Sequence, residues 1–308
     1  MSEPVLKLDE IVVLRRTDPT GPFGLWGARP VRAVDGVSLT VDREETLGLM
    51  GGSGAGKTTL AQAATLRLPL HRGNLLMLGE DVRRLDRKRA RRRLQLVPQD
   101  PRESLDLDRR VDEQLDQLVR AYELPDGGAR IRRALERVGL PPEQFLKRTP
   151  RQMSGGEQQR LAIAQALVLN PLLVALDEPV SGVDPRLREE LLDLLADVQR
   201  EQGVAYLLIS QDLRVIGRLA RRVAIMHLGR ICEVGPTEQV LMNPRHPYSR
   251  RFLGKEEGAL PPDENTAGRV FAGCPWAPHC PHAVERCTRE RPAEREVAPG
   301  HLATCHVL

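Results

Sequence analysis

Three short runs of mostly apolar residues predict buried strands. They lie at residues 46–50, 172–176 and 204–210. A short run of this kind, without alternation of polar residues, is typical of parallel strands that are covered on both faces. Because helical patterns stand between these runs, the sequence predicts an α/β fold.

Other strands are expected outside these runs. Residues 6–14 and 34–41 have the character of two strands, and residues 222–234 predict a hairpin that turns at Gly229. The turn-rich stretch 17–27 joins the first two strands and contains two of the few aromatic residues. We expect these aromatics to face a partner, to stack on adenine or to anchor the loop locally.

Helical periodicity dominates residues 104–152. Apolar residues recur there at intervals of three and four, with breaks at 125–128 and 141–142, where proline and glycine gather. The pattern predicts an inserted segment that is entirely helical. A further helix is expected at 185–198, capped by the residues that precede it.

A strongly basic stretch at residues 83–93 has eight basic residues among eleven, which suggests a nucleic-acid surface. No aromatic residue interleaves with the charges, and the apolar residues of 94–97 follow at once. This is the pattern of an exposed helix that leads into a buried strand, so we expect no nucleic-acid partner. Two prolines flank Gln99 beyond that strand and hold it in a loop.

A glycine-rich stretch follows the first apolar run and precedes a helical pattern. It matches the spacing G-x-x-x-x-G-K-S/T, in which successive backbone N–H groups wrap a triphosphate at a helix N-terminus. The matching residues are Gly51, Gly52, Ser53, Gly54, Ala55, Gly56, Lys57 and Thr58, followed by Thr59. We expect Lys57 to reach the β- and γ-phosphates and Thr58 to bind Mg²⁺. A dinucleotide motif does not fit, because Lys57 stands where that motif has a glycine.

Two further motifs carry groups that suit a phosphate site. Ser154, Gly155 and Gly156 precede a helix and offer its unpaired N–H groups to an anion. Asp177 and Glu178 follow the second apolar run, at the strand end where open α/β sheets bind ligands. We expect Asp177 to hold Mg²⁺ and Glu178 to act as the general base on the attacking water.

The composition limits the number of domains and the kinds of partner but does not by itself indicate a function. The chain has 308 residues, of which 41% are hydrophobic and 29% charged, which is ordinary for about two globular domains. The net charge of +4 is too small to imply a nucleic-acid partner. No signal-peptide pattern and no apolar run of about 18 residues is present, so we expect a cytoplasmic protein that spans no membrane.

In their order along the chain, the phosphate loop at 51–58, Gln99, the segment 153–157 and the acid pair at 177–178 resemble the nucleotide-binding subunits of ABC transporters. The resemblance covers residues 5–235. It implies an α/β P-loop NTPase core of the RecA-like type, with an antiparallel β subdomain and an inserted helical subdomain.

The resemblance also implies where the domains divide. We expect a nucleotide-binding domain at residues 1–235, with its helical subdomain at about 100–160. A small cysteine-rich extension is expected at 236–308.

In such transporters two subunits enclose two ATP molecules, and each site joins one chain's phosphate loop to the other chain's signature. The signature residues are Ser154, Gly155, Gly156 and Glu157. The resemblance implies that they serve the γ-phosphate of the partner's nucleotide. Asp184 matches the loop that crosses the dimer, and Gln99 matches the residue that senses the γ-phosphate and Mg²⁺ beside the membrane subunit.

Some positions depart from the family pattern. Gln211 stands where a switch histidine is usual, which puts full hydrolysis at this chain's own site in question. Glu157 and Met153 replace a usual glutamine and leucine. Arg15 stands where relatives place an aromatic residue against adenine, and a guanidinium can also stack on a base.

The segments after and before the core resemble one branch of the family. Residues 243–250 and the tail at 273–305 resemble the importers of oligopeptides, dipeptides and nickel, and residues 31–38 resemble their F-type ATPase. This implies a heterodimer with a second ATPase, bound to two membrane permeases and served by an extracytoplasmic solute-binding protein. The chain would then lie at the cytoplasmic face of the membrane.

We therefore expect an ATPase that energises peptide import. Import of nickel or another small solute is one alternative, and a weakly active regulatory subunit is another, which Gln211 favours and Glu178 disfavours. A chromosome-maintenance ATPase of the same superfamily is disfavoured, because only 97 residues separate Lys57 from Ser154, too few for a long coiled coil.

Four cysteines crowd the last 35 residues. They are Cys274, Cys280, Cys287 and Cys305, separated by five, six and seventeen residues. A disulfide is disfavoured in a reducing cytosol. Zinc fits the four nearby histidines but lacks the usual C-x2-C spacing. A 4Fe–4S cluster suits four thiolates and is in keeping with the resemblance; free thiols are the third alternative.

Overall fold

A computed structural model describes residues 3–16, 30–257, 260 and 271–308. The chain divides into two compact units. The first unit consists mainly of Leu76–Ile209, and the second mainly of Lys7–Thr40, Thr46–Leu75 and Ser210–Leu308. The aromatic residues expected in the 17–27 stretch lie outside the described residues.

Parallel strands form the centre of the first unit. The strands β6, β7 and β8 span Leu94–Val97, Leu173–Asp177 and Ala205–Ile209. They pair in this order, with Val97 opposite Leu176 and Asp177 opposite Ile209. Every residue of β7 and β8 is buried, which confirms the prediction of buried parallel strands and places Asp177 at a strand's carboxyl end.

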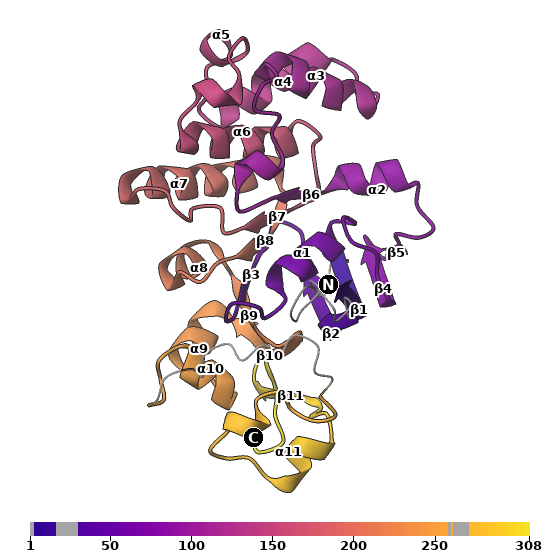
Figure 1. The fold of residues 1–308 in the computed structure, drawn as a ribbon, viewed down its shortest axis with the longest axis vertical. Helices are drawn as coiled ribbons and strands as arrows, with labels where there is room; N and C mark the ends of the chain where they lie inside the picture. The colour runs from indigo at the N-terminus through magenta and orange to yellow at the C-terminus, as the bar shows by residue number, and fades with distance from the viewer. Residues whose placement is uncertain (1–2, 17–29, 258–259, 261–270) are drawn as a thin grey trace, which may run out of the picture. The chain divides into compact units, whose positions relative to one another are not determined.

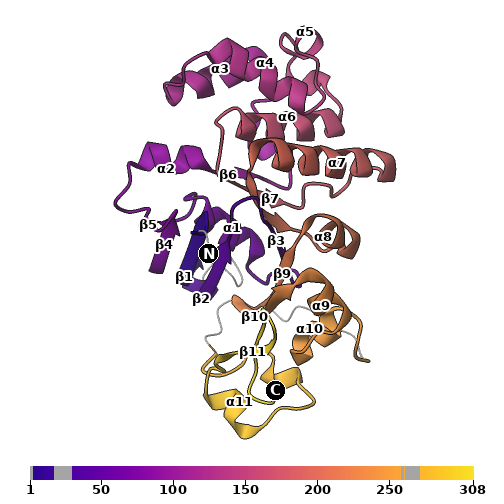
Figure 2. The ribbon, with the colours of Figure 1, turned by 180° about the vertical axis from the view of Figure 1, so that it is seen from behind.

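Helices make up most of the remaining first unit, as Figures 1 and 2 show for α3, α4, α5 and α6. The bounds are α2 Arg87–Arg93, α3 Val111–Ala121, α4 Gly127–Arg137, α5 Pro142–Phe145, α6 Gly155–Leu167 and α7 Pro185–Gln202, with 3-10 turns at Pro101–Glu103 and Pro150–Gln152. The helix α4 contacts α3, α5 and α6. The helical insertion is thereby confirmed.

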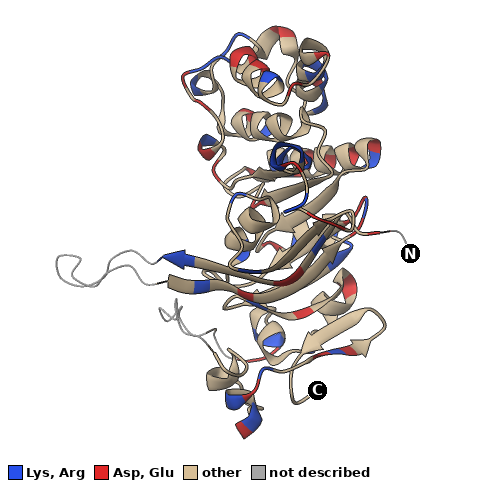
Figure 3. Cartoon of the chain, turned by 90° about the vertical axis from the view of Figure 1, so that its right-hand side faces the viewer, with Lys and Arg blue, Asp and Glu red and all other residues tan. Residues whose placement is uncertain are grey.

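Within the basic stretch at 83–93, residues 87–93 form the partly exposed helix α2, which leads into the buried strand β6, as expected. Asp86 caps α2 by accepting a hydrogen bond from the Arg89 N–H at 2.7 Å, and Ala90 is its buried residue. Elsewhere on this unit both signs of charge share the helices (Figure 3), as in the pairs Arg132–Glu143 and Arg160–Glu190.

The second unit contains a mixed sheet and the helices beside it. Its strands are β3 Thr46–Met50, β9 Arg222–His227, β10 Arg230–Pro236, β12 His301–Thr304 and β11 Glu294–Ala298, which pair in this order. The first pair is parallel and the others are antiparallel. Its helices are α1 Lys57–Ala64, α8 Leu213–Leu219, α9 Thr237–Met242, α10 Pro247–Phe252 and α11 Glu285–Arg289, with a 3-10 turn at Ala277–His279.

A second sheet is formed by strands from the N-terminal part of the chain. The strands β2 Pro30–Val41, β1 Leu6–Arg16 and β4 Arg72–Met77 are neighbours in this order, and β5 Glu80–Asp81 pairs antiparallel with the end of β4. The expected strands at 6–14 and 34–41 are thus present and slightly longer.

In the described ranges, no helix is both long and apolar enough to cross a membrane.

The β9–β10 hairpin turns at Gly229, as the sequence predicts. Leu228 and Gly229 have φ angles of 44° and 83°, the left-handed pair that a two-residue hairpin turn requires. The strands β11 and β12 were not predicted. They extend the sheet from β10, with Glu233 opposite Ala303, and so build the C-terminal residues into the second unit.

Candidate nucleotide-binding site

The phosphate loop joins β3 to α1 in the second unit. Two of its glycines are required by the space around them. A Cβ on Gly51 would lie 2.1 Å from the Met226 carbonyl oxygen, and one on Gly56 would lie 2.2 Å from the Ala33 carbonyl oxygen. Gly56 also has a φ of 101°. Side-chain-free residues therefore let the backbone close tightly here and present its N–H groups.

The N-terminus of α1 is suited to an anion. Gly56 stands at the N-cap with no side chain to occupy the N–H groups, and the first turn holds no acidic residue. Lys57 is buried, and its Nζ donates to the carbonyl oxygens of Gly51 and Gly52 at 2.9 and 2.8 Å. Thr58 is exposed, whereas Thr59 is buried. The positive helix end and the ammonium together fit a triphosphate.

Arg15 lies beside this helix. At the end of β1, its Nη2 donates to the Gln62 side chain at 2.8 Å and its Nε to the Thr59 hydroxyl at 3.5 Å. The side chain is exposed. Arg15 therefore stays a prediction for the residue that meets the adenine.

Gln211 also belongs to the second unit. It stands exposed between β8 and α8. The Ser210 hydroxyl accepts a hydrogen bond from the Asp212 N–H, and Asp212 in turn caps α8 through the Arg214 N–H. Both neighbours of Gln211 are thus held, which fixes the backbone at the predicted switch position.

The acid pair belongs to the first unit. Asp177 ends β7 and is 4% exposed, and Glu178 follows it half-buried. The Glu178 N–H donates to the Ile209 carbonyl oxygen at 3.0 Å, while its φ is 47°. A left-handed conformation is costly for a glutamate, and such strain gathers at functional sites.

Gln99 and the signature lie in the first unit too. Gln99 is exposed in the loop that ends β6, as its flanking prolines predict. Ser154 caps α6, and Glu157 reaches back so that its carboxylate accepts from the Ser154 N–H and hydroxyl at 2.7 and 2.8 Å. Glu157, one of the departures from the family pattern, thus completes a capping box. Gly155 is exposed beside it.

Asp184 caps α7. Its carboxylate accepts hydrogen bonds from the N–H groups of Arg186 and Leu187, both at 3.1 Å. Pro185 begins the helix, as the sequence predicts, and the cap leaves Asp184 exposed.

Magnesium has oxygen donors of the right kind in both units. The Thr58 hydroxyl lies in the second unit, and the Gln99 amide and Asp177 carboxylate lie in the first. Hydroxyl, amide and carboxylate oxygens are hard ligands that Mg²⁺ accepts alongside phosphate and water. The donor set therefore fits the ion, and the pairing of these residues around it stays a prediction.

The four C-terminal cysteines lie near each other without forming a metal cage. Burial, with smaller contributions from the thiols of Cys305, Cys280 and Cys287, raises the pKa of Cys274 to about 11. The Cys274 N–H donates to the Cys287 carbonyl oxygen at 2.8 Å. Within the described residues, however, no three His, Cys, Asp or Glu side chains are placed to hold a metal ion. All five cysteines of the chain are free thiols in this structure.

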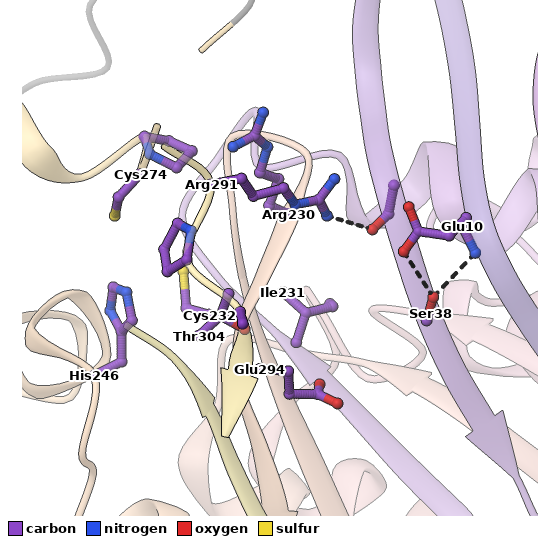
Figure 4. Close-up of a pocket in the computed structure, with 14 residues that line it drawn as sticks. Glu10, Ser38, Arg230, Ile231, Cys232, His246, Cys274, Arg291, Glu294 and Thr304 are labelled. Carbon is purple, nitrogen blue, oxygen red and sulfur yellow. Dashed lines mark hydrogen bonds between the residues drawn. The ribbon is translucent and has the colours of Figure 1, made fainter. Parts of the chain in front are cut away.

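A cavity of about 400 Å³ is lined by C-terminal residues, by β10 and by Glu10 and Ser38 of β1 and β2 (Figure 4). Arg230 in its wall is fully engaged: it pairs with Asp35 at 2.7 Å and donates to the carbonyl oxygens of Phe271 and Gly273. Burial alone would raise the pKa of Asp35, but hydrogen bonds and charge from Arg230 and Arg32 outweigh it and lower the pKa. Arg230 is thus a structural clamp.

Sequence reasoning missed Tyr248. Its hydroxyl accepts a hydrogen bond from the Gly52 N–H of the phosphate loop at 3.1 Å. Tyr248 lies in the 243–250 segment, whose resemblance to the importer branch was the only signal and carried no role for the side chain.

Two family models match the chain: "ABC transporter" over residues 34–181, and "Oligopeptide/dipeptide transporter, C-terminal region" over residues 232–287. A protein of Brucella abortus, provisionally named a peptide import ATP-binding protein, is 37% identical over 321 residues, which cover 99% of this chain and 94% of that protein. A protein of Sinorhizobium fredii, provisionally named a peptide ABC transporter ATP-binding protein, is 37% identical over 297 residues, which cover 90% and 83%.

A solved structure agrees with these matches. The structure of cbiO1 from Clostridium perfringens, part of the ABC transporter complex cbiONQ, is similar with a TM-score of 0.65 and 25% identity. The match covers 79% of this chain and 92% of that one.

Proposed function

Because this chain belongs to the ATP-binding proteins of ABC transporters, we propose that it hydrolyses ATP to drive the import of peptides. The observation that carries the proposal is the phosphate loop, with its close-packed glycines, its buried Lys57 and its helix end without an acidic residue. The match of residues 232–287 to the oligopeptide/dipeptide transporter region supports peptides as the cargo.

The proposed chemistry is in-line attack of water on the γ-phosphate. The loop N–H groups and Lys57 would hold the β- and γ-phosphates, and Glu178 would polarise the water. Mg²⁺, held by Thr58, Asp177 and Gln99, would neutralise charge on the phosphates. Most of the rate enhancement would come from positioning and charge stabilisation, since phosphoryl transfer needs little covalent help from the protein.

The signature would act on a second nucleotide. We propose that Ser154, Gly155, Gly156 and Glu157 close the site of a partner ATPase, and that Asp184 lies at the dimer interface. The exposure of Ser154, Gly155 and Asp184 is compatible with such an interface. The proposed assembly is a heterodimer of ATPases that binds two permeases at the cytoplasmic face of the membrane and works with an extracytoplasmic solute-binding protein.

The proposed division of the chain follows the family. A nucleotide-binding domain would cover residues 1–235, with a helical subdomain at about 100–160, and a C-terminal extension would cover 236–308. Within that extension, we propose that Cys274, Cys280, Cys287 and Cys305 hold a 4Fe–4S cluster, for which their side chains would have to move closer together than in this structure, where no three described residues are placed to hold a metal. The mutual effect of these thiols on the pKa of Cys274 supports their proximity, and no step of the hydrolysis depends on the cluster.

Replacing Lys57 tests the nucleotide site. Lys57→Ala removes the charged donor to the phosphates, and a hydrogen bond to a charged group contributes about 1.5–3 kcal/mol. We therefore expect the Kd for Mg·ATP to rise about tenfold to a hundredfold in an equilibrium binding measurement.

Lys88→Ala is the matched control, because Lys88 is a surface lysine paired with Glu123. Its Kd should equal that of the wild type. If Lys57→Ala also binds ATP like the wild type, the phosphate site is misassigned.

A further inference from the structure

One side chain from the C-terminal part of the chain meets the phosphate loop directly. The Gly52 N–H donates to the Tyr248 hydroxyl at 3.1 Å, across 196 residues of sequence. Tyr248 is 2% exposed, so its hydroxyl is presented from the protein interior. Both residues belong to the second unit.

Three elements fix the direction of this hydroxyl. The Tyr248 ring stacks on His227 at the end of β9, with centroids 4.1 Å apart, and meets the Trp276 ring edge-on at 5.3 Å. At the start of α10, the Tyr248 N–H donates to His246 Nδ1 at 3.0 Å. The phenol therefore has little freedom to leave Gly52.

The other side of the loop is held by the β9–β10 turn. The Gly229 N–H donates to the Ala55 carbonyl oxygen, and the Gly229 carbonyl oxygen accepts from the Asp35 N–H, both at 2.9 Å. Asp35 pairs with Arg230, which also donates to the carbonyl oxygen of Gly273, next to Cys274. Two separate chains of contacts thus connect the phosphate loop to the cysteine-bearing segment. One runs through Tyr248 to Trp276, and the other runs from the β9–β10 turn through Arg230 to Gly273.

We propose that Tyr248 is a positioning residue of the phosphate loop, and that through Tyr248 and Trp276 the loop's affinity for phosphate depends on the cysteine-bearing C-terminal segment. The proposal rests on the nucleotide binding proposed above. The hydroxyl orders the loop at Gly52 before a nucleotide arrives, so less ordering remains for binding to accomplish. Trp276 is 1% exposed and belongs to the cysteine-bearing segment, so a shift of that segment moves the ring that supports Tyr248.

Tyr248→Phe isolates the hydroxyl, because phenylalanine keeps the ring contacts. A neutral hydrogen bond of this kind contributes about 0.5–1.5 kcal/mol, so we expect the Kd for nucleotide to rise about two- to tenfold. The affinities for ATP and for ADP should fall by the same factor, since the loop holds the phosphates that both nucleotides share. In the assembled transporter KM should rise while kcat stays unchanged, a split that general loss of stability does not produce.

Tyr206→Phe is the matched control. Its hydroxyl donates to the Leu195 carbonyl oxygen at 3.1 Å in the first unit and is buried, so this variant loses a comparable bond away from the phosphate loop. Its nucleotide affinity should equal that of the wild type. If Tyr248→Phe binds like Tyr206→Phe, the proposal fails. A tighter Kd would also overturn it, because the hydroxyl would then compete with phosphate for the Gly52 N–H.

Trp276 fluorescence tests the coupling to the C-terminal segment. With Trp26 replaced by phenylalanine, Trp276 is the remaining tryptophan. Saturating Mg·ATP should change the fluorescence emission of Trp276 in this protein, and should change it less when Tyr248→Phe is added. Emission that does not respond to bound nucleotide would refute the coupling. Failure of the proposed function is distinguishable, because the starting protein would then show no ATP binding that depends on Lys57.

Discussion

Glu178 and Gln211 define the residue scale of the proposed catalysis. Glu178 directly follows the last residue of β7 and is half-buried. Its backbone is in the left-handed conformation, which the hydrogen bond from its N–H to the Ile209 carbonyl oxygen holds in place. Gln211 occupies the predicted switch position. An imidazole there can become cationic, whereas an amide can donate a hydrogen bond but stays neutral and has one more rotatable bond to immobilise.

We therefore predict that this chain's own site is the slower of two unequal sites. Gln211→His should raise its single-turnover hydrolysis rate in the proposed heterodimer, by at most about 10²–10³, the effect of one pre-organised donor in another enzyme class. The variant should also gain a pH dependence near about 6.5, the usual imidazole pKa.

Glu178→Gln supplies the comparison in the same complex, since it removes the base from the same site. A small loss is expected, because the site contributes little. If Glu178→Gln removes half of the total activity and Gln211→His hydrolyses no faster, the sites are equally competent.

At the scale of elements, the β9–β10 hairpin organises the second unit. Its turn contacts the phosphate loop through Gly229, and Arg230 at the start of β10 pairs with Asp35. Glu233 in β10 accepts hydrogen bonds from the N–H groups of Arg245 and His246 and contacts His301 of β12 at 2.6 Å. A single hairpin thus joins the nucleotide loop, α10 and the last strand.

Two histidines in and beside this hairpin, the half-buried His227 and the buried His246, make stability depend on pH. Burial lowers the pKa of His227 to about 3, helped by His246 and His279, and burial lowers that of His246 to about 4. Unfolded imidazoles have a pKa of about 6.5. Below about pH 6.5 these histidines bind protons in the unfolded state but stay neutral in the folded state, so the free energy of unfolding should fall as the pH is lowered. Each group contributes a fall of about 1.4 kcal/mol per pH unit until the pH reaches its folded pKa.

His227→Phe should remove one group's share of this slope, since phenylalanine retains a ring against Tyr248. Urea unfolding between about pH 4.5 and 6.5 measures it. His71→Gln is the control, because His71 is exposed and should leave the slope unchanged. An identical slope in His227→Phe and the wild type would show that this histidine does not stay neutral in the folded state.

At the scale of the whole molecule, the C-terminal residues share one compact unit with the phosphate loop. They contribute β12 and β11 to the sheet through β10, and they bury Trp276 against His227 and Tyr248. Burying an indole in this way contributes apolar stabilisation that the second unit would lose without the tail. A metal held by the cysteines would therefore bear on the nucleotide loop as well.

Metal analysis of protein purified without oxygen tests whether the four C-terminal cysteines hold a metal. A 4Fe–4S cluster predicts about four irons per chain and visible charge-transfer absorption, whereas zinc predicts metal without colour. Cys280→Ser should lose the metal. Cys232→Ala is the comparison, because the buried Cys232 of β10 lies close enough to Cys274 and Cys305 for their charge to raise its pKa. A site made of the four C-terminal cysteines predicts that this variant retains the metal. Protein with neither iron nor zinc would leave four free thiols and end both metal hypotheses.

Local pattern alone determined much of this protein. The apolar runs at 46–50, 172–176 and 204–210 predict strands because continuous burial needs continuous apolarity, and the glycine spacing at 51–56 predicts a phosphate loop because close backbone approach excludes side chains. Proline and glycine mark the ends of the helices for similar reasons. Each of these signals acts within a few residues, so it can be read without knowing what lies opposite.

Only the tertiary structure decided which distant residues meet. The bonds from Gly52 to Tyr248 and from Arg230 to Asp35 join residues 196 and 195 positions apart, and no local pattern encodes such a separation. The pairing of β10 with β12 is of the same kind, since a strand's partner depends on the path of the chain between them. Contacts of this range form because the whole core closes around them, and for that reason the role of Tyr248 appears only in the folded protein.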